Sequence, residues 1–278
     1  MAVTRLIERR VEKPWGRREL GPIFGVVPAD AEPIGEIWFE HPGRADLPLL
    51  VKYLFTSQKL SIQVHPDDEA AIASGQKGGK DEAWIVLDAD PEATIGIGLR
   101  TEVTADRLRT AALDGSIESR SPGGRRSGTG LLDWRPAATG DIYYSPAGTV
   151  HALGAGLILV EIQQAADLTY RLYDYGRPRE LHLDEAVEIA DPAPFEGVAR
   201  SRHLGNGREV ICEGRAFRVE RWSGAGAHRL PQETTWLVPI AGSARADGED
   251  MLPGSVWLAE EAEITLEADA QLLAAFPA

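Results

Sequence analysis

The sequence predicts a mainly β fold, built as a sandwich or barrel in two β-rich halves that meet near residue 200. Two observations support this prediction. The 278 residues include 29 Gly and 18 Pro, so turn signals recur along the whole chain. Short runs with strand character lie between these turns, and stretches with a helical pattern are few.

The first half contains five of these strand-like runs. They are rich in β-branched, aromatic and leucine residues, which suit a pleated and half-buried surface. They are 49–55 (LLVKYLF), 60–64 (LSIQV), 83–87 (AWIVL), 141–144 (DIYY) and 157–163 (LILVEIQ).

Two segments of the first half favour short helices. Residues 67–73 follow Pro66 and end before Gly75, so both boundaries carry a helix signal. Residues 104–113 begin with Thr104, a residue type that caps helix N-termini, and continue with good helix formers. The basic, glycine-rich segment 115–130 fits either a surface loop or a lid that faces an anionic ligand.

A polar segment rich in Pro and Gly, 192–207, predicts a linker. Strand-like runs return after it, which indicates a second β-rich half. They are 217–222, 234–240, 255–258, 263–266 and 271–276. We therefore divide the chain into residues 1–200 and 201–278.

The composition argues against some classes of partner. The formal charge is −14, from 29 Lys and Arg against 43 Asp and Glu, which argues against a nucleic-acid surface. A local basic cluster can still bind a small anion. The single cysteine, Cys212, suits a core position in a reducing cytoplasm, and no apolar run is long enough to cross a bilayer. We expect a cytoplasmic protein with no membrane or nucleic-acid partner.

Four residues in the first half form a candidate metal site. Alternation places Gln63 and His65 on one face at the end of a strand-like run. Glu82 begins the next run, and His151 follows the turn at 146–148 (PAG), which would aim it back into a barrel. Two imidazoles, a carboxylate and an amide oxygen suit zinc or another first-row divalent ion.

These residues lie in segments that resemble the signature of class I mannose-6-phosphate isomerases, in their short bacterial form. The resemblance covers about residues 11–192, and its motifs occur in the family's order. They are 13–16 (KPWG), 35–38 (GEIW), 63–68 (QVHPDD), 79–84 (GKDEAW), 146–152 (PAGTVHA) and 161–174 (EIQQAADLTYRLYD). Residues 140–151 also resemble the second cupin motif, except that Ala155 stands where that motif commonly has Asn.

The resemblance implies a bicupin, that is, two jelly-roll-type β-barrels with a few short helices. Residues 1–200 would be the catalytic cupin domain with one metal ion, usually zinc. Residues 201–278 would be a degenerate cupin domain without metal, since no His-rich pattern occurs there. The implied reaction interconverts mannose 6-phosphate and fructose 6-phosphate, and the protein would be a monomer or a homodimer.

The resemblance also assigns roles to individual residues. It implies that Gln63, His65, Glu82 and His151 bind the metal. Arg171 corresponds to the family's active-site arginine. Four further positions line the family's pocket, and of these we assign Lys52 and Ser61 to substrate binding and Lys80 and Glu161 to catalysis.

The catalytic base is left open among three groups. Glu161 is our first choice, because the apolar run around it would raise its pKa toward neutrality. Lys80 and a metal-bound water are the alternatives. Lys52 also stands in an apolar run, where a buried lysine needs a partner, and either a phosphate or a buried carboxylate would serve.

Two other functions remain as alternatives. One is a cupin isomerase or epimerase that acts on another sugar or on an unphosphorylated sugar. The other is a sugar-sensing bicupin that binds metal without catalysis. The presence of all four ligand candidates together with Glu161 and Arg171 argues against the second alternative.

Overall fold

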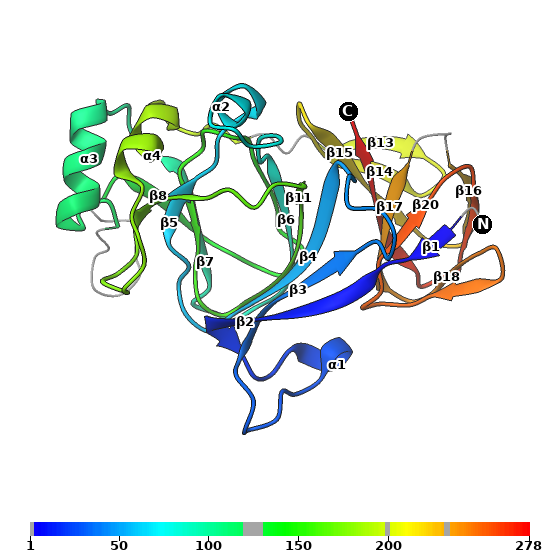
Figure 1. The fold of residues 1–278 in the computed structure, drawn as a ribbon. Coiled ribbons are helices and arrows are strands. Elements are labelled where there is room, and N and C mark those ends of the chain that lie inside the picture. The colour runs from blue at the N-terminus through cyan, green and yellow to red at the C-terminus, as the bar shows by residue number, and fades with distance from the viewer. Residues whose placement is uncertain (1–2, 119–129, 198–200, 231–233) are drawn as a thin grey trace.

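The computed structural model describes residues 3–118, 130–197, 201–230 and 234–278. In this part of the chain, antiparallel strands form four sheets, two in each half of the molecule. Figure 1 shows the two halves side by side, with both chain termini in the C-terminal half. This arrangement confirms the predicted mainly β fold of two barrel-like units.

The N-terminal half consists of a six-stranded and a five-stranded sheet. From one edge to the other, the first contains β2 (Ile7–Arg17), β3 (Ile34–Glu40), β4 (Leu49–Thr56), β11 (Leu157–Gln164), β6 (Glu82–Ala89) and β9 (Ile142–Ser145). The second contains, in the same sense, β12 (Tyr170–Tyr173), β5 (Ile62–Val64), β10 (His151–Leu153), β7 (Thr94–Leu99) and β8 (Leu132–Pro136).

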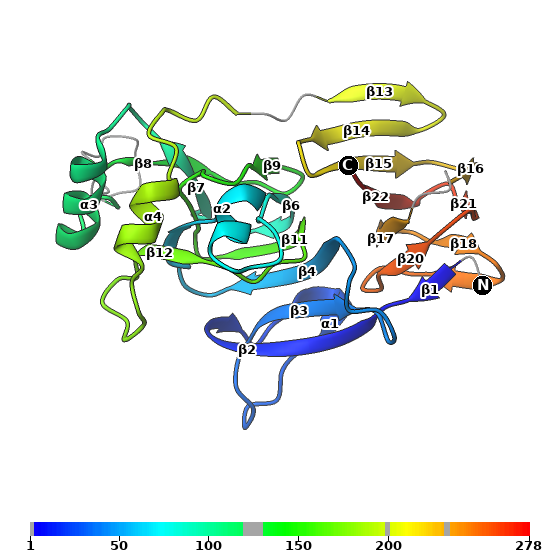
Figure 2. The ribbon, with the colours of Figure 1, turned by 45° about the horizontal axis from the view of Figure 1, so that its top comes forward.

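The C-terminal half consists of a seven-stranded and a four-stranded sheet. The first contains β1 (Val3–Arg5), β20 (Trp257–Ala259), β17 (Thr235–Ala241), β22 (Gln271–Pro277), β15 (Phe217–Ser223), β14 (Arg208–Glu213) and β13 (Arg202–Gly205). The second contains β16 (Gly226–Arg229), β21 (Glu263–Leu266), β18 (Ala244–Ala246) and β19 (Glu249–Met251). Strand β1 comes early in the sequence but pairs with β20, so residues 3–5 belong to the C-terminal half (Figure 2).

Four helices lie in the described residues, and two of them were predicted, one with its cap at Thr104. They are α1 (Gly21–Phe24), α2 (Asp68–Ala73), α3 (Ala105–Asp114) and α4 (Leu183–Ile189). The side chain of Asp67 accepts a hydrogen bond from Ala70 N at the start of α2, and Thr104 does the same for Arg107 N at the start of α3. Helix α3 ends at Gly115, whose φ of +76° suits a left-handed C-cap.

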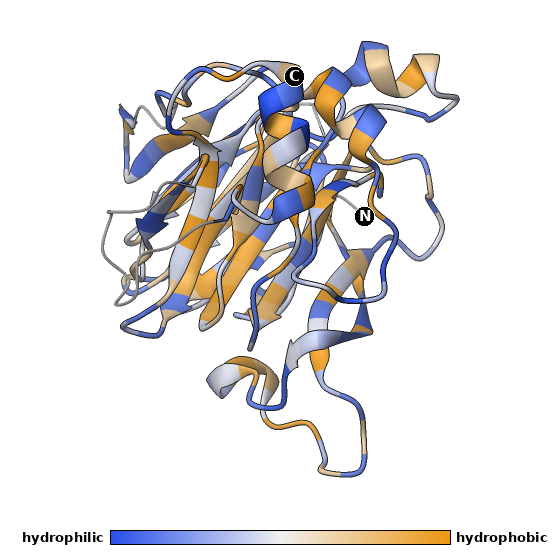
Figure 3. Ribbon diagram, turned by 90° about the vertical axis from the view of Figure 1, so that its left-hand side faces the viewer, coloured by the Kyte–Doolittle hydropathy of each residue, from blue (hydrophilic) through white to orange (hydrophobic). Residues whose placement is uncertain are grey.

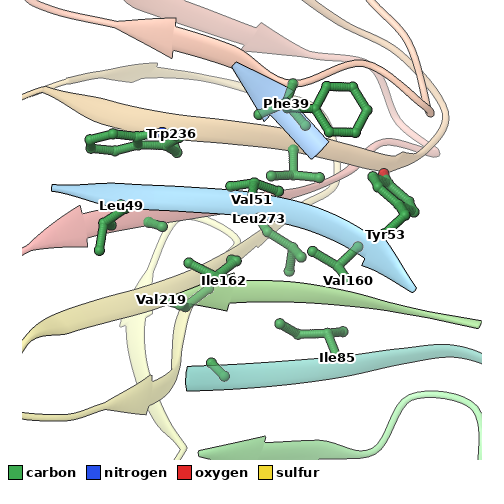
Figure 4. Packing of buried hydrophobic residues seen from close by; sticks show 14 of the residues in the cluster. Phe39, Leu49, Val51, Tyr53, Ile85, Val160, Ile162, Val219, Trp236 and Leu273 are labelled. Atoms are coloured by element: carbon green, nitrogen blue, oxygen red, sulfur yellow. The ribbon is translucent and has the colours of Figure 1, made fainter. Parts of the chain in front are cut away.

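The main hydrophobic core lies between the two halves. Outward-facing residues of the six-stranded sheet, including Val51 and Ile162, pack against Val219, Trp236 and Leu273 of the seven-stranded sheet (Figure 4). Figure 3 shows the same pattern along the strands, where hydrophobic residues are concentrated and the connecting loops are more hydrophilic. The opposite face of the six-stranded sheet is therefore free to line a site inside the N-terminal half.

Several elements differ from the sequence prediction. The predicted linker at 192–207 is too long, because Arg202–Gly205 form β13 and pair with β14. Helix α4 and strands such as β2 and β3 were not predicted. Most of the basic segment 115–130, including Arg120, Arg125 and Arg126, lies outside the described residues. Among the described helices, none has the length and apolar character to span a bilayer.

Candidate active site

A polar cavity of about 280 Å³ lies in the N-terminal half between its two sheets. All nine residues that the sequence analysis proposed for the site are in or beside this cavity. Eight of them line it, and His65 stands directly behind them with its Nε2 3.5 Å from Gln63 Nε2. The lining residues are Lys13, Trp15, Glu36, Lys52, Leu54, Leu60, Ser61, Gln63, Lys80, Glu82, Trp84, His151, Leu153, Glu161, Asp167, Leu168, Thr169, Arg171, Arg179 and His182.

Strand register explains why residues far apart in sequence meet in this cavity. In the five-stranded sheet, Gln63 on β5 pairs with His151 on β10 and with Arg171 on β12. In the six-stranded sheet, Glu161 on β11 pairs with Lys52 on β4 and Trp84 on β6. Directly paired residues point to the same face of a sheet, so each sheet presents a row of polar side chains to the cavity.

The two histidines have their ring orientation fixed by backbone carbonyl groups. His65 Nδ1 lies 2.7 Å from Leu168 O, and His151 Nδ1 lies 2.9 Å from Thr149 O. A carbonyl only accepts, so each Nδ1 must carry the proton and donate it. The unprotonated Nε2 atoms then remain as free electron-pair donors. Burial lowers the pKa of His151 to about 3 and also lowers the pKa of His65, so both rings stay neutral at pH 7.

The Glu82 carboxylate completes a set of three metal-ligating groups with these imidazoles. Ligand atoms of His65, Glu82 and His151 all lie within 4.8 Å of one another, and each residue is buried. Burial by itself would raise the pKa of Glu82, but the charge of the adjacent Lys80 holds it well below its usual range. Glu82 is therefore ionised, and the donor set of two imidazoles and one carboxylate suits a divalent first-row metal.

Lys80 is the cation that accompanies Glu82 in this structure. Its ammonium group forms an ion pair with Glu82 Oε1 and lies 3.3 Å from His65 Nε2. Burial lowers the pKa of Lys80, but the negative charges of Glu82 and Glu161 outweigh this and raise it. One positive charge thus already balances the buried carboxylate at the point where the three ligand groups converge.

Gln63 stands at the fourth position that the sequence predicted. Its amide nitrogen lies 3.3 Å from His151 Nε2 and 3.5 Å from His65 Nε2, while its oxygen accepts a hydrogen bond from Ser61 Oγ at 2.9 Å. The hydroxyl of Ser61 can also accept, so the amide can present either atom to the two imidazoles. The residues therefore fit a metal ion as an N, N, O set with an amide oxygen in reach.

Beside the ligand groups lies a buried ion pair with a tryptophan. Lys52 Nζ is 3.4 Å from Glu161 Oε1, and Trp84 Nε1 donates to Glu161 Oε2 at 3.0 Å. The ammonium also lies 4.3 Å from the ring centroid of Trp38. Of the two partners expected for Lys52, the structure thus holds the buried carboxylate. Burial and the nearby Glu82 raise the pKa of Glu161, which confirms the predicted direction.

Arg171 reaches the cavity from β12 and has no carboxylate at ion-pair distance among the described residues. Its Nε is buried without a hydrogen-bond partner. Burial and the neighbouring Arg179 lower its pKa, although a guanidinium remains charged at any physiological pH. Arg179 is held by two hydrogen bonds to Asp174. Arg171 is therefore a free cation that faces the cavity.

The sequence analysis missed some lining residues. Trp84 could have been found from its spacing, because it stands two positions after Glu82 on the same strand face. Arg179 and His182 carried no such signal, since they lie in a loop and just before α4, and reach the cavity through the tertiary fold. Together the lining contains five basic and four acidic side chains, so the cavity is far less acidic than the protein as a whole.

No family model matches the chain. Mannose-6-phosphate isomerase ManA from Bacillus subtilis is 32% identical to it over 243 residues, which cover 79% of this chain and 72% of that protein. Identity at this level over most of both chains shows a family relationship in addition to a shared fold.

Solved structures agree with this relationship. A crystal structure of mannose 6-phosphate isomerase from Bacillus subtilis matches with a TM-score of 0.83 and 27% identity, over 99% of each chain. A zinc-bound holo structure of a mannose 6-phosphate isomerase matches with a TM-score of 0.77 and 16% identity, over 100% of each chain. At that lower identity the second match shows the fold alone.

Proposed function

The chain belongs to the mannose-6-phosphate isomerase family, and we propose that it interconverts mannose 6-phosphate and fructose 6-phosphate in the cavity between the two N-terminal sheets. The observation that carries this proposal is the joint placement of His65, Glu82 and His151 next to the buried pair of Lys52 and Glu161. A carboxylate base and a metal ion that polarises the carbonyl are together one way to catalyse aldose–ketose isomerisation, and this cavity offers groups for both.

Glu161 is the proposed base. In the forward direction it takes the proton from C2 of mannose 6-phosphate, exchanges it with solvent at the enediol stage and delivers a proton to C1, while a hydroxyl proton passes from O2 to O1. A raised pKa makes the ionised Glu161 a stronger proton acceptor than an ordinary glutamate, which favours removal of the C2 proton. Trp84 fixes one carboxylate oxygen, and Lys52 lies beside the other.

Gln63, His65, Glu82 and His151 are the proposed ligands of one metal ion, which we assign as zinc from the donor types. When bound, zinc would polarise the carbonyl of the substrate and stabilise negative charge on its oxygen. The two backbone carbonyl contacts keep both Nε2 atoms directed to the same point, so the protein organises this site before the ion arrives.

Two cations are proposed to act on the substrate's oxygens. Arg171 has no carboxylate partner at ion-pair distance among the described residues, so its guanidinium is available to an oxyanion that develops during the reaction. Lys80 lines the cavity beside Glu82 and can donate to a sugar hydroxyl. Lys52, on the six-stranded sheet, and Ser61, beside β5 of the five-stranded sheet, are proposed to contact the substrate from the two walls of the cavity. A phosphate would add negative charge to a cavity whose basic groups outnumber its acidic ones.

Isotope exchange tests the proton transfer directly. Mannose 6-phosphate incubated with the protein in D₂O should yield fructose 6-phosphate, with deuterium entering at C1, as measured by NMR. Glu161→Gln should stop both product formation and deuterium entry. Deuterium entry at the wild-type rate in that variant would remove Glu161 from the role of base.

A cytoplasmic location and a monomeric or homodimeric state remain predictions.

A further inference from the structure

Asp81 lies between two residues of the site but points away from it. Lys80 and Glu82 face the cavity, so alternation at the start of β6 turns the Asp81 side chain to the opposite side. There it is buried, with only 1% of its surface exposed. Tyr144 donates its hydroxyl hydrogen to Asp81 Oδ2 at 2.5 Å, and Ala147 N donates to Asp81 Oδ1 at 2.9 Å. A buried carboxylate with two such donors is held firmly.

Both donors belong to the segment that leads to the ligand His151. Tyr144 lies on strand β9, one residue before its end, and Ala147 stands in the turn at 146–148. The next residue, Gly148, has a φ of +86° and donates its N–H to the backbone oxygen of His65 at 2.8 Å. The Asp81 carboxylate thus joins the strand that bears Glu82 to the turn that fixes the backbone at His65 and His151.

Two residues of the C-terminal half pack directly against Tyr144. A Cβ placed on Gly214 would lie 1.8 Å from the Tyr144 hydroxyl oxygen, so no side chain fits there without moving the phenol. The ring of Phe217 packs against Tyr144 with 5.4 Å between ring centroids. Gly214 and Phe217 therefore set where the hydroxyl of Tyr144 can stand.

We propose that Asp81 and Tyr144 are positioning residues of the metal site. We also propose that Gly214 of the C-terminal half supports this site, because its lack of a side chain lets the Tyr144 hydroxyl reach Asp81. The inference rests on the proposed function and its metal site. No side chain of the C-terminal half lines the cavity among the described residues. This half reaches the site from behind, by setting the Tyr144 hydroxyl against Asp81 and through a longer ion pair of 4.0 Å from Arg215 to Asp81 Oδ1. Loss of that hydrogen bond frees the backbone that carries Glu82 and the turn before His151.

Two substitutions test the connection from its two ends. Tyr144→Phe removes only the hydroxyl, and Gly214→Ala displaces it from the other half of the protein. Outer groups that orient metal ligands typically change metal affinity by a factor of about 10 to 100, and we expect zinc binding to weaken about tenfold in each variant. The dissociation constant is measured by competition for Zn²⁺ with a chromogenic chelator, so the readout does not depend on turnover.

Matched controls separate positioning from general stability. Tyr143→Phe makes the same chemical change one residue away, where the hydroxyl contacts Asp141 and Pro136 near the surface. Gly43→Ala adds a methyl group where no atom lies within 4 Å. Both controls should bind zinc like the wild type. The melting temperature of each metal-free variant is recorded alongside, because a merely structural role would lower it without changing the zinc constant.

The double variant provides the decisive comparison. If Gly214 acts through the Tyr144 hydroxyl, adding Gly214→Ala to Tyr144→Phe should weaken zinc binding little further. Wild-type zinc constants in both single variants, or independent and additive effects in the double variant, would overturn the inference while leaving the proposed function intact. Absence of zinc binding in the wild type would overturn the proposed metal site, and with it this inference.

Discussion

Lys52 and Glu161 stand directly opposite each other on strands β4 and β11, and their charged groups are 3.4 Å apart. Only 3% of Lys52 and 5% of Glu161 is exposed, so water does little to screen the pair. Lys52 lowers the pKa of Glu161, whereas burial, the larger effect, raises it together with Glu82. The net result is a carboxyl whose pKa lies above that of an ordinary glutamate.

Replacement of Glu161 by glutamine should abolish most turnover without loss of metal. The amide keeps the shape but cannot accept the C2 proton, and removal of a general base typically costs a factor of about 10² to 10⁴ in rate. The measurement is kcat together with zinc content. Glu188→Gln, at an exposed position on α4, is the control. Zinc loss in Glu161→Gln would indicate a structural role instead.

Lys52→Met should move the acid limb of the pH–rate profile to higher pH. The lysine charge favours the ionised carboxylate, so its removal raises the pKa of Glu161 further. The base works only when it is ionised, and kcat/KM will therefore begin to fall at a higher pH than in the wild type. Lys77→Met, an exposed substitution, should leave the profile in place. If the acid limb of the Lys52→Met profile stays at the wild-type pH, Glu161 is not the group whose titration causes that limb.

His151→Gln should remove the stabilisation that zinc gives to the folded protein. A ligand that binds only the native state stabilises it by about 2.7 kcal/mol at a free concentration about 100 times its dissociation constant. We expect urea unfolding to show this gain for the wild type, and little of it for His151→Gln. His203→Gln, at an exposed position on β13, should retain the gain. An equal zinc effect in His151→Gln would mean that the ion binds elsewhere.

Trp236→Ala should destabilise both halves together, by about 3 to 5 kcal/mol. Trp236 comes from the C-terminal half but belongs to the core that also contains Val51 and Ile162 of the N-terminal half. One urea titration follows both zinc release and circular dichroism. The midpoints of the two transitions should move to lower urea concentration by the same amount. Leu252→Ala, with 53% of Leu252 exposed, is the control. Zinc release at an unchanged urea concentration would show that the halves unfold separately.

Much of the site could be predicted because it follows from period-2 alternation and from short motifs. Gln63 and His65 share a strand face, and Glu82 begins a strand, so local sequence was enough to mark them as candidates. The cross-strand pairing of Lys52 with Glu161 depends on which strands are neighbours in the sheet. A single sequence carries no direct signal for that order, and the partner of Lys52 therefore remained open.

The missed elements have a related explanation. Strand β2 reads Ile-Glu-Arg-Arg-Val-Glu-Lys over residues 7–13 and is largely exposed, so it lacks the apolar run that marks a buried strand. Strand β13 is fully exposed and lies in a segment rich in Gly and polar residues, which resembles a linker. β13 and the first part of β2 are held by hydrogen bonds to a neighbouring strand rather than by burial of their own side chains, and only the end of β2 buries a large residue, Trp15.

The most direct test of the central claim is an assay of mannose 6-phosphate conversion by the purified protein before chelation, after chelation and after zinc is restored. The account predicts formation of fructose 6-phosphate that the chelator abolishes and zinc recovers. Absence of turnover in protein shown to contain one zinc ion per chain would contradict the proposed substrate. Turnover that persists in fully metal-free protein would contradict the role of the His65, Glu82 and His151 site.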